Sequence, residues 1–215
     1  MLAMGRVHDI SVTLGRESID YPGDTPYARS LLMAAPQDFC TLSRVEMSAH
    51  SGTHIDVPSH FEDGGRSLTD YAAADFVFPA LVIEIADTEC VRADALAGAD
   101  VRAGDAVLFK TANSRDGRVR SGVFSEDFVY VAPDAAAWLR ERGARLVGID
   151  YITIEGYANR GFDSHHIVLG AGMIVLESVD LGAVAPGRYT LFCLPLKMAG
   201  AEASPVRAIL VEDPA

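Results

Sequence analysis

The sequence has few cysteines, and this scarcity bears on the compartment of the protein. Only Cys40, Cys90 and Cys193 occur, widely spaced and without a CxxC pair. This pattern indicates reduced, buried thiols in a cytoplasmic protein rather than a disulfide framework. A catalytic cysteine is the alternative, although no local signature accompanies any of the three.

Long apolar runs and positive charge are also scarce. The longest apolar run, residues 167–176, is shorter than the roughly 20 residues of a membrane-spanning helix. The first residues also lack the apolar stretch of a signal peptide. The chain has 18 basic and 30 acidic residues, a net charge of −12, which phosphate backbones and anionic membranes would repel. We therefore expect a protein that binds neither nucleic acid nor membranes.

The sequence is rich in short runs of Val, Ile, Leu, Thr and aromatic residues, which predict strands. Several runs are continuously apolar, as in strands that are buried on both faces. The runs cover residues 8–14, 80–86, 105–111, 145–155, 173–179, 189–196 and 206–212.

Helix signals are fewer. Residues 132–143 predict a helix that begins at Pro133 and ends at Gly143, and residues 92–98 predict a weaker one. With 215 residues, we expect one α/β domain over residues 1–215, with a mixed, largely buried sheet and a few helices.

The stretch YPGDTP, residues 21–26, predicts a type II turn. Pro22 presets the first corner, and Gly23 supplies the positive φ that the second corner needs. The turn places Tyr21 at the edge of a loop. A plain surface turn without a function is the alternative.

Three of the six histidines fall within HSGTHIDVPSH, residues 50–60. A helical site is disfavoured there, because Gly52 and Pro58 interrupt any helix. In an extended segment alternate side chains point to one face, so the polar residues at even positions would converge. These residues are His50, His54, Asp56 and His60.

Two imidazoles and a carboxylate on one face are three ligands for a divalent metal, as in catalytic sites that keep one position open. His50, His54 and Asp56 supply this set. His60 follows the bend at Pro58, where it could act as a general acid or base. The alternative is a group of unrelated histidines held in turns.

A second group of ionisable residues lies in DSHHIVLGAGMIVLESV, residues 163–179. It contains His165, His166 and, within an apolar run, Glu177. A buried glutamate is rare unless it is paired or bound to a metal. The alternative is a glutamate on an edge strand that faces water.

The complete pattern H-x-G-T-H-x-D-x-P-x-H at residues 50–60 resembles the central motif of the cyclase family of metal-dependent hydrolases, which includes arylformamidases and isatin hydrolases. The resemblance extends over nearly the whole chain and implies a swivelling β/β/α fold. It also implies assembly into a homo-oligomer, a dimer or a tetramer. Segments that match in order are DYPGDTP, GDAVLFKT, LVGIDYITIE, HHIVLGAGMIVLES and LPLKMAGAEASPVRAI.

The resemblance also assigns roles to individual residues. It implies that Asp56 binds metal and bridges two ions where two are present, and that His60 transfers protons. His165 matches a later histidine ligand, and Glu177 matches a glutamate ligand twelve residues further on. His166 does not fit this spacing and is taken as a neighbour. His50 and His54 match the first two ligands of the motif.

Two positions depart from the family pattern. Tyr21 stands where kynurenine formamidases tend to have a tryptophan that lines the substrate, so the resemblance implies a substrate-binding role for Tyr21. Asn113, in the run TAN, stands where many members have a tryptophan.

Three imidazoles and two carboxylates suit Zn²⁺ or Mn²⁺ better than Ca²⁺, with one or two ions per chain. Such a metal lowers the pKa of water to about 7. Because G-x-S-x-G is absent, water is the expected nucleophile. We expect hydrolysis of a small amide, formamide, lactam or lactone, with His60 returning the proton to the leaving group. The alternatives are a metal-dependent cyclase or lyase acting on a carbonyl, and a non-catalytic metal-binding protein.

Overall fold

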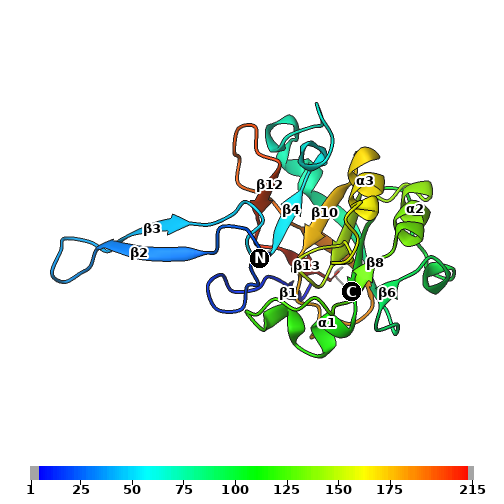
Figure 1. Cartoon of the computed structure of the whole chain (residues 1–215), viewed down its shortest axis with the longest axis horizontal. Helices are drawn as coiled ribbons and strands as arrows, with labels where there is room; N and C mark the ends of the chain where they lie inside the picture. Colours follow the sequence, from blue (N-terminus) through cyan, green and yellow to red (C-terminus); the bar gives the residue numbers. More distant parts are fainter. Residues whose placement is uncertain (1–4, 213–215) are drawn as a thin grey trace.

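A computed structural model describes residues 5–212, and its centre is a nine-stranded sheet (Figure 1). The strand order is β1-β13-β11-β5-β7-β9-β10-β4-β12. The strands are β1 (Val7–Asp9), β4 (His54–Asp56), β5 (Val77–Glu84), β7 (Ala106–Lys110), β9 (Leu146–Ile149), β10 (Ile174–Glu177), β11 (Gly187–Phe192), β12 (Ala203–Pro205) and β13 (Ile209–Val211).

The sheet is mixed, as the sequence predicts. Strands β5, β7, β9 and β10 pair in parallel, and the flanking strands pair antiparallel. Side chains alternate between two cores: Leu108 and Leu146 pack on one face, and Val107 and Val147 pack on the other. The central strands are therefore buried on both faces, which explains their continuously apolar sequences.

The remaining elements are short. Two small sheets pair β2 (Ala28–Met33) with β3 (Leu42–Glu46), and β6 (Cys90–Val91) with β8 (Tyr130–Val131). The helices are α1 (Ala112–Arg115), α2 (Pro133–Glu141) and α3 (Asp163–Gly170). The 3-10 turns are η1 (Pro58–His60), η2 (Leu68–Asp70), η3 (Ala73–Phe76), η4 (Asp94–Leu96) and η5 (Arg118–Arg120). None of the helices in residues 5–212 has the length and apolar character to cross a membrane.

Helix α2 begins at Pro133 as predicted, and Gly143 follows its end with a φ of +72°. The weaker helix predicted over residues 92–98 is wrong, because only the 3-10 turn η4 forms there. The predicted strand over residues 145–155 ends at Ile149, and the chain then continues as a buried loop through Glu155.

Several elements are absent from the sequence-based prediction, and two of the missing features bear on the argument below. Helix α3 is one, because its apolar residues run directly into those of β10 and resemble one long strand. The other is the β2–β3 hairpin, which projects away from the body of the molecule (Figure 1). Its connecting loop carries Cys40, which is partly exposed, whereas Cys90 and Cys193 are buried as predicted.

Candidate metal centre

The histidine-rich segment is not the continuous strand that the sequence predicts. Only His54–Asp56 is extended, as β4. Gly52 has a φ of +63° and packs so closely on Leu14 that a Cβ would lie 2.6 Å from its side chain. Pro58 begins the 3-10 turn η1, which ends at His60. The expectation of one uniform face was therefore wrong, although these bends still bring the side chains together.

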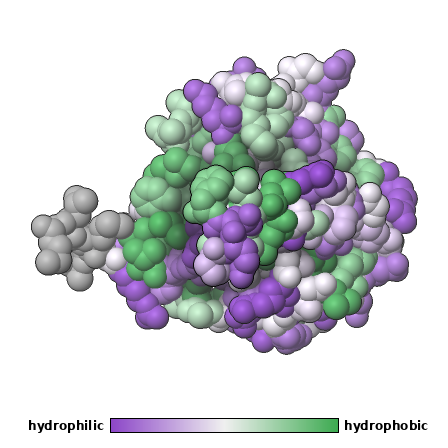
Figure 2. All heavy atoms as spheres, turned by 90° about the vertical axis from the view of Figure 1, so that its left-hand side faces the viewer, coloured by the Kyte–Doolittle hydropathy of each residue, from purple (hydrophilic) through white to green (hydrophobic). Residues whose placement is uncertain are grey.

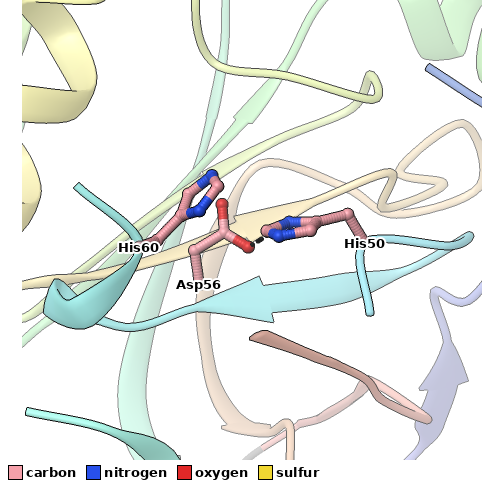
Figure 3. Close-up of side chains that lie close together, drawn as sticks. All are labelled: His50, Asp56 and His60. Atoms are coloured by element: carbon pink, nitrogen blue, oxygen red, sulfur yellow. Dashed lines mark ion pairs between the residues drawn. The ribbon is translucent and has the colours of Figure 1, made fainter. Parts of the chain in front are cut away.

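The centre is built around Asp56. Its Oδ1 lies 2.9 Å from His50 Nδ1 and 3.5 Å from His54 Nε2. Figure 3 shows the rings of His50 and His60 on either side of the Asp56 carboxylate, and the two ring centroids are 4.3 Å apart. Three residues from a turn, a strand and a 3-10 turn thus face one carboxylate.

Strand β10 supplies a second carboxylate to the same centre. β10 pairs antiparallel with β4, and Glu177 is the direct partner of His54. Glu177 Oε2 lies 3.2 Å from His54 Nε2, and Glu177 Oε1 lies 3.5 Å from His165 Nε2 on α3. Glu177 is buried on an interior strand, so the alternative of a water-facing edge glutamate is wrong. His166 points elsewhere, with its Nδ1 3.3 Å from Glu62.

Potential ligand atoms form two overlapping groups within residues 5–212. One group is His50, Asp56 and His60, and the other is His54, Asp56 and Glu177; within each, the ligand atoms lie within 4.8 Å of one another. Asp56 belongs to both groups, as a bridging carboxylate would. His60 is thus as close to the centre as the residues that the sequence marks as ligands.

Buried polar atoms at the centre lack hydrogen-bond partners within the described part of the chain. They are His54 Nε2 and both carboxylate oxygens of Asp56, of which His54 Nε2 and Asp56 Oδ1 make ion-pair contacts only. Burying polar atoms without hydrogen bonds is costly, and native proteins rarely leave them so. Imidazole nitrogen and carboxylate oxygen are ligands of divalent transition metals, so the donor set fits a divalent cation.

Two of the histidines are held with Nε2 toward the carboxylates. His54 Nδ1 lies 2.8 Å from the carbonyl oxygen of Gly52, and His165 Nδ1 lies 3.3 Å from Oε2 of the buried Glu155. Sequence reasoning did not single out Glu155. The available signal was a glutamate at the end of the apolar run 145–155.

The electrostatics reflect the mixture of buried acids and bases. Burial alone would lower the pKa of His50, but the Asp56 carboxylate outweighs it and raises the pKa to about 9. Burial alone would also lower the pKa of His165, but the carboxylates of Glu155 and Glu177 raise it to about 9. His60 differs, because burial lowers its pKa and the charges of His50 and His165 add to this effect, against the opposing effect of Asp56.

For the carboxylates, burial would raise the pKa. The neighbouring histidines outweigh it and lower the pKa of Asp56 and of Glu177. In the absence of a metal the centre is thus a set of ion pairs, with anionic carboxylates beside cationic imidazoles.

The centre forms the floor of a cavity of about 230 Å³. Aromatic side chains form part of its wall, and these are Tyr21, Phe61 and Phe162. The turn before the cavity is as predicted, because Asp24 N donates to the carbonyl of Tyr21 and Gly23 has a φ of +103°. Tyr21 thus lines the cavity, and its ring packs edge-on against Phe124, with the two ring centroids 5.6 Å apart.

Asn113 does not lie on this cavity. It is fully buried at the start of α1, where its side-chain nitrogen donates to the carbonyl of Val129 and to Asp150 Oδ1. The departure from the family pattern at this position therefore changes internal packing and not the cavity wall.

The fold is a mixed sheet that holds a buried cluster of imidazoles and carboxylates beside a cavity. This arrangement is typical of metal-dependent enzymes. The chain belongs to the family described as putative cyclase, whose model matches residues 8–156. The resemblance that the HxGTHxDxPxH pattern indicated is thereby confirmed.

Individual relatives agree over nearly the full length. The kynurenine formamidase of Bordetella avium is 35% identical over 211 residues, which is 97% of this chain and 99% of the relative. The kynurenine formamidase of Bacillus cereus strain ATCC 14579 is 32% identical over 203 residues, which is 94% of this chain and 95% of the relative.

Solved structures confirm the α/β fold class. The structure described as a predicted metal-dependent hydrolase from Bacillus stearothermophilus has a TM-score of 0.83 and 32% identity, covering 97% of this chain and 98% of the other. Isatin hydrolase A from Ralstonia solanacearum also has a TM-score of 0.83, over 97% of this chain and 92% of the other, but is 22% identical. At that identity the likeness concerns the fold alone.

Proposed function

We propose that this protein is a metal-dependent hydrolase that uses water to cleave the C–N bond of a small amide. The observation that carries this function is the buried centre with unpartnered ligand atoms on the floor of an open cavity. The residues that hold the cation in this proposal are His50, His54, Asp56, His165 and Glu177.

A divalent cation in the centre would lower the pKa of water and polarise a carbonyl. His60 then acts on the protons: it accepts one from the attacking water and returns it to the leaving nitrogen. Its lowered pKa favours the neutral ring that a proton acceptor needs at pH 7. The aromatic wall that includes Tyr21 holds a flat substrate and limits the access of bulk water.

Arylformamides are the substrate class that the comparisons favour. Two relatives that are 35% and 32% identical over nearly the whole chain, from Bordetella avium and Bacillus cereus, are named kynurenine formamidase. The isatin hydrolases share the fold at 22% identity or less. We therefore rank N-formylkynurenine above isatin as a substrate.

The donor set supports Zn²⁺ or Mn²⁺, because nitrogen ligands are mixed with carboxylates. The shared position of Asp56 supports one or two ions per chain. We infer one domain over residues 1–215, because the nine-stranded sheet includes both β1 near the start and β13 near the end. A cytoplasmic location is supported only by the unpaired cysteines.

The decisive experiment incubates Zn²⁺-loaded and Mn²⁺-loaded protein with N-formylkynurenine, isatin and a small lactone in water enriched in ¹⁸O. Hydrolysis of the formamide must place solvent oxygen in the released formate. Turnover without solvent oxygen would identify a cyclase or lyase instead. Metal binding without turnover of any of the three would leave a metal-binding protein and contradict the proposal.

A further inference from the structure

Glu155 is a buried carboxylate that lies behind the centre rather than in it. It follows β9 in the buried loop, and its Oε2 accepts hydrogen bonds from the backbone nitrogens of Ser164 (3.1 Å) and His165 (3.3 Å). The same Oε2 lies 3.3 Å from His165 Nδ1. Its Oε1 accepts a bond from Asn159 Nδ2 at 2.7 Å.

This geometry sets which nitrogen of the His165 ring carries the proton when the ring is neutral. Glu155 Oε2 already accepts hydrogen bonds from two backbone nitrogens, so it faces His165 Nδ1 as an acceptor and Nδ1 donates to it. The lone pair of the neutral ring then lies on Nε2, which is the atom that faces Glu177. Because Glu155 bonds both the backbone and the ring of His165, it fixes the ring relative to α3.

His54 shows the same arrangement with a different acceptor. Its Nδ1 bonds the backbone carbonyl of Gly52, and its Nε2 faces Asp56 and Glu177. Two rings from distant elements thus present the same nitrogen to one centre. At His54 the backbone sets this orientation, whereas at His165 a side chain sets it, and a side chain can be exchanged.

We propose that Glu155 is a positioning residue that sets the tautomer and rotation of His165 and so prepares Nε2 as a metal ligand. The inference rests on the proposed function, because it requires a cation in the centre. Such outer partners of ligating histidines typically contribute 10–100-fold to metal affinity.

Three variants separate this role from general stability. Glu155→Gln keeps an acceptor oxygen for Nδ1 but removes the charge, whereas Glu155→Met has similar length and no strong acceptor. Asn159→Ala is the matched control, because it removes the other side-chain partner of Glu155 and leaves His165 untouched. The dissociation constant for Zn²⁺, measured by competition with a chelator, should rise about 10–100-fold in Glu155→Met. It should change much less in Glu155→Gln and stay unchanged in Asn159→Ala.

Two spectroscopic measurements make the test independent of stability. Nitrogen NMR of the Zn²⁺-loaded wild type should show His165 protonated at Nδ1 and ligated through Nε2. The visible spectrum of the Co²⁺-loaded protein should change in Glu155→Met and not in Asn159→Ala. Ligation through Nδ1, or equal Zn²⁺ affinity in Glu155→Met and wild type, would overturn the role of Glu155. Failure of the wild type to bind metal would instead contradict the proposed function.

A separate observation concerns the β2–β3 hairpin. Of the eleven residues in its two strands, nine are exposed and none is buried, so neither face packs on the body of the molecule. Isolated two-stranded hairpins are only marginally stable in water. Large apolar side chains are nevertheless exposed on it, including Leu32 (61% exposed) and Phe39 (89% exposed). Figure 2 views this side of the molecule and shows hydrophobic side chains at its surface.

The charge distribution favours a second copy of this chain as the partner that binds the hairpin. Residues 28–46 contain two arginines, Arg29 and Arg44, and two acids, Asp38 and Glu46, so this segment is neutral. The whole net charge of −12 therefore lies on the rest of the chain. Two copies carry the same net negative charge, and this neutral, apolar hairpin adds no like-charge repulsion to a contact between them. Both of its strands also have a free edge, which allows symmetric pairing of two hairpins.

The family resemblance already implies a homo-oligomer, and we infer that the β2–β3 hairpin is the surface through which its copies dock. Light scattering of the wild type should give at least twice the 23.0 kDa of one chain. Leu32→Asp and Phe39→Asp should each shift the protein toward the mass of one chain while retaining bound metal, which reports on folding. Val123→Asp is the matched control, because Val123 is 68% exposed and lies outside the hairpin.

A wild type of 23.0 kDa would overturn this inference, as would an oligomer that survives both hairpin substitutions. Dissociation caused by Val123→Asp alone would place the interface elsewhere. A monomer that binds neutral lipid vesicles through Phe39 would make the hairpin a membrane contact instead.

Discussion

Metal binding at pH 7 should release about two protons from the protein. Without metal, His50 and His165 have pKa values raised to about 9 by the adjoining carboxylates. Each ring is then mostly protonated at pH 7, and each must lose a proton before it can ligate. His60 adds nothing, because its pKa is lowered and its ring is already neutral.

The exchange conserves the buried charge. Before binding, the positive charges of His50 and His165 balance the negative charges of Asp56 and Glu177. After binding, the two positive charges of one divalent cation replace those of the imidazolium rings. Since two protons compete with the cation, its apparent affinity should rise by about 100-fold per pH unit from pH 7 toward pH 9. Above that range the gain should level off, because both rings are then neutral.

Isothermal titration calorimetry of the metal-free protein measures this release directly. Zn²⁺ is titrated at pH 7 in two buffers of different ionisation enthalpy, and the difference in heat gives the number of protons. His165→Ala should release about one proton fewer, whereas His166→Ala, the exposed neighbour, should match the wild type. A wild-type release well below one proton, or the same release from His165→Ala, would refute the charge exchange.

Four further outcomes follow from the geometry. His60→Asn should lower kcat by roughly 10²–10⁴ with unchanged metal content by elemental analysis; loss of metal would make His60 a ligand. Asp56→Ala should lose more bound metal than His54→Ala, because Asp56 belongs to both ligand groups. If both variants keep the metal content of the wild type, the site is contradicted. Tyr21→Ala should raise KM for N-formylkynurenine without loss of metal, and unchanged steady-state kinetics would make the turn merely structural. Leu139→Ala, in the buried face of α2, should lower the free energy of unfolding by about 2–5 kcal/mol in a denaturant titration.

The central strands and helix α2 could be predicted because local signals and tertiary structure agree there. The apolar runs of β7, β9 and β10 are buried on both faces, and α2 carries both its Pro133 start and its Gly143 stop. Helix α3 could not be predicted, because its boundary with β10 depends on a turn at Gly172 inside one apolar run.

The candidate site was predictable in composition but not in geometry. The spacing of His50, His54 and Asp56 identified the chemistry, yet the side chains converge through turns at Gly52 and Pro58 rather than by strand alternation. Glu155 was missed because its role depends on the position of α3, which no local pattern encodes.

The pairing of β4 with β10 has a consequence for the order of events during synthesis. His54 and its strand partner Glu177 are 123 positions apart, so the ribosome delivers the first half of the centre long before the second. A nascent chain that ends before Glu177 has only the nitrogen-rich part around His50, His54 and Asp56. A cation that needs both carboxylates would therefore be held fully only after β10 has paired with β4. The metal content of the folded protein would then report whether the two strands have paired in the register that places Glu177 beside His54.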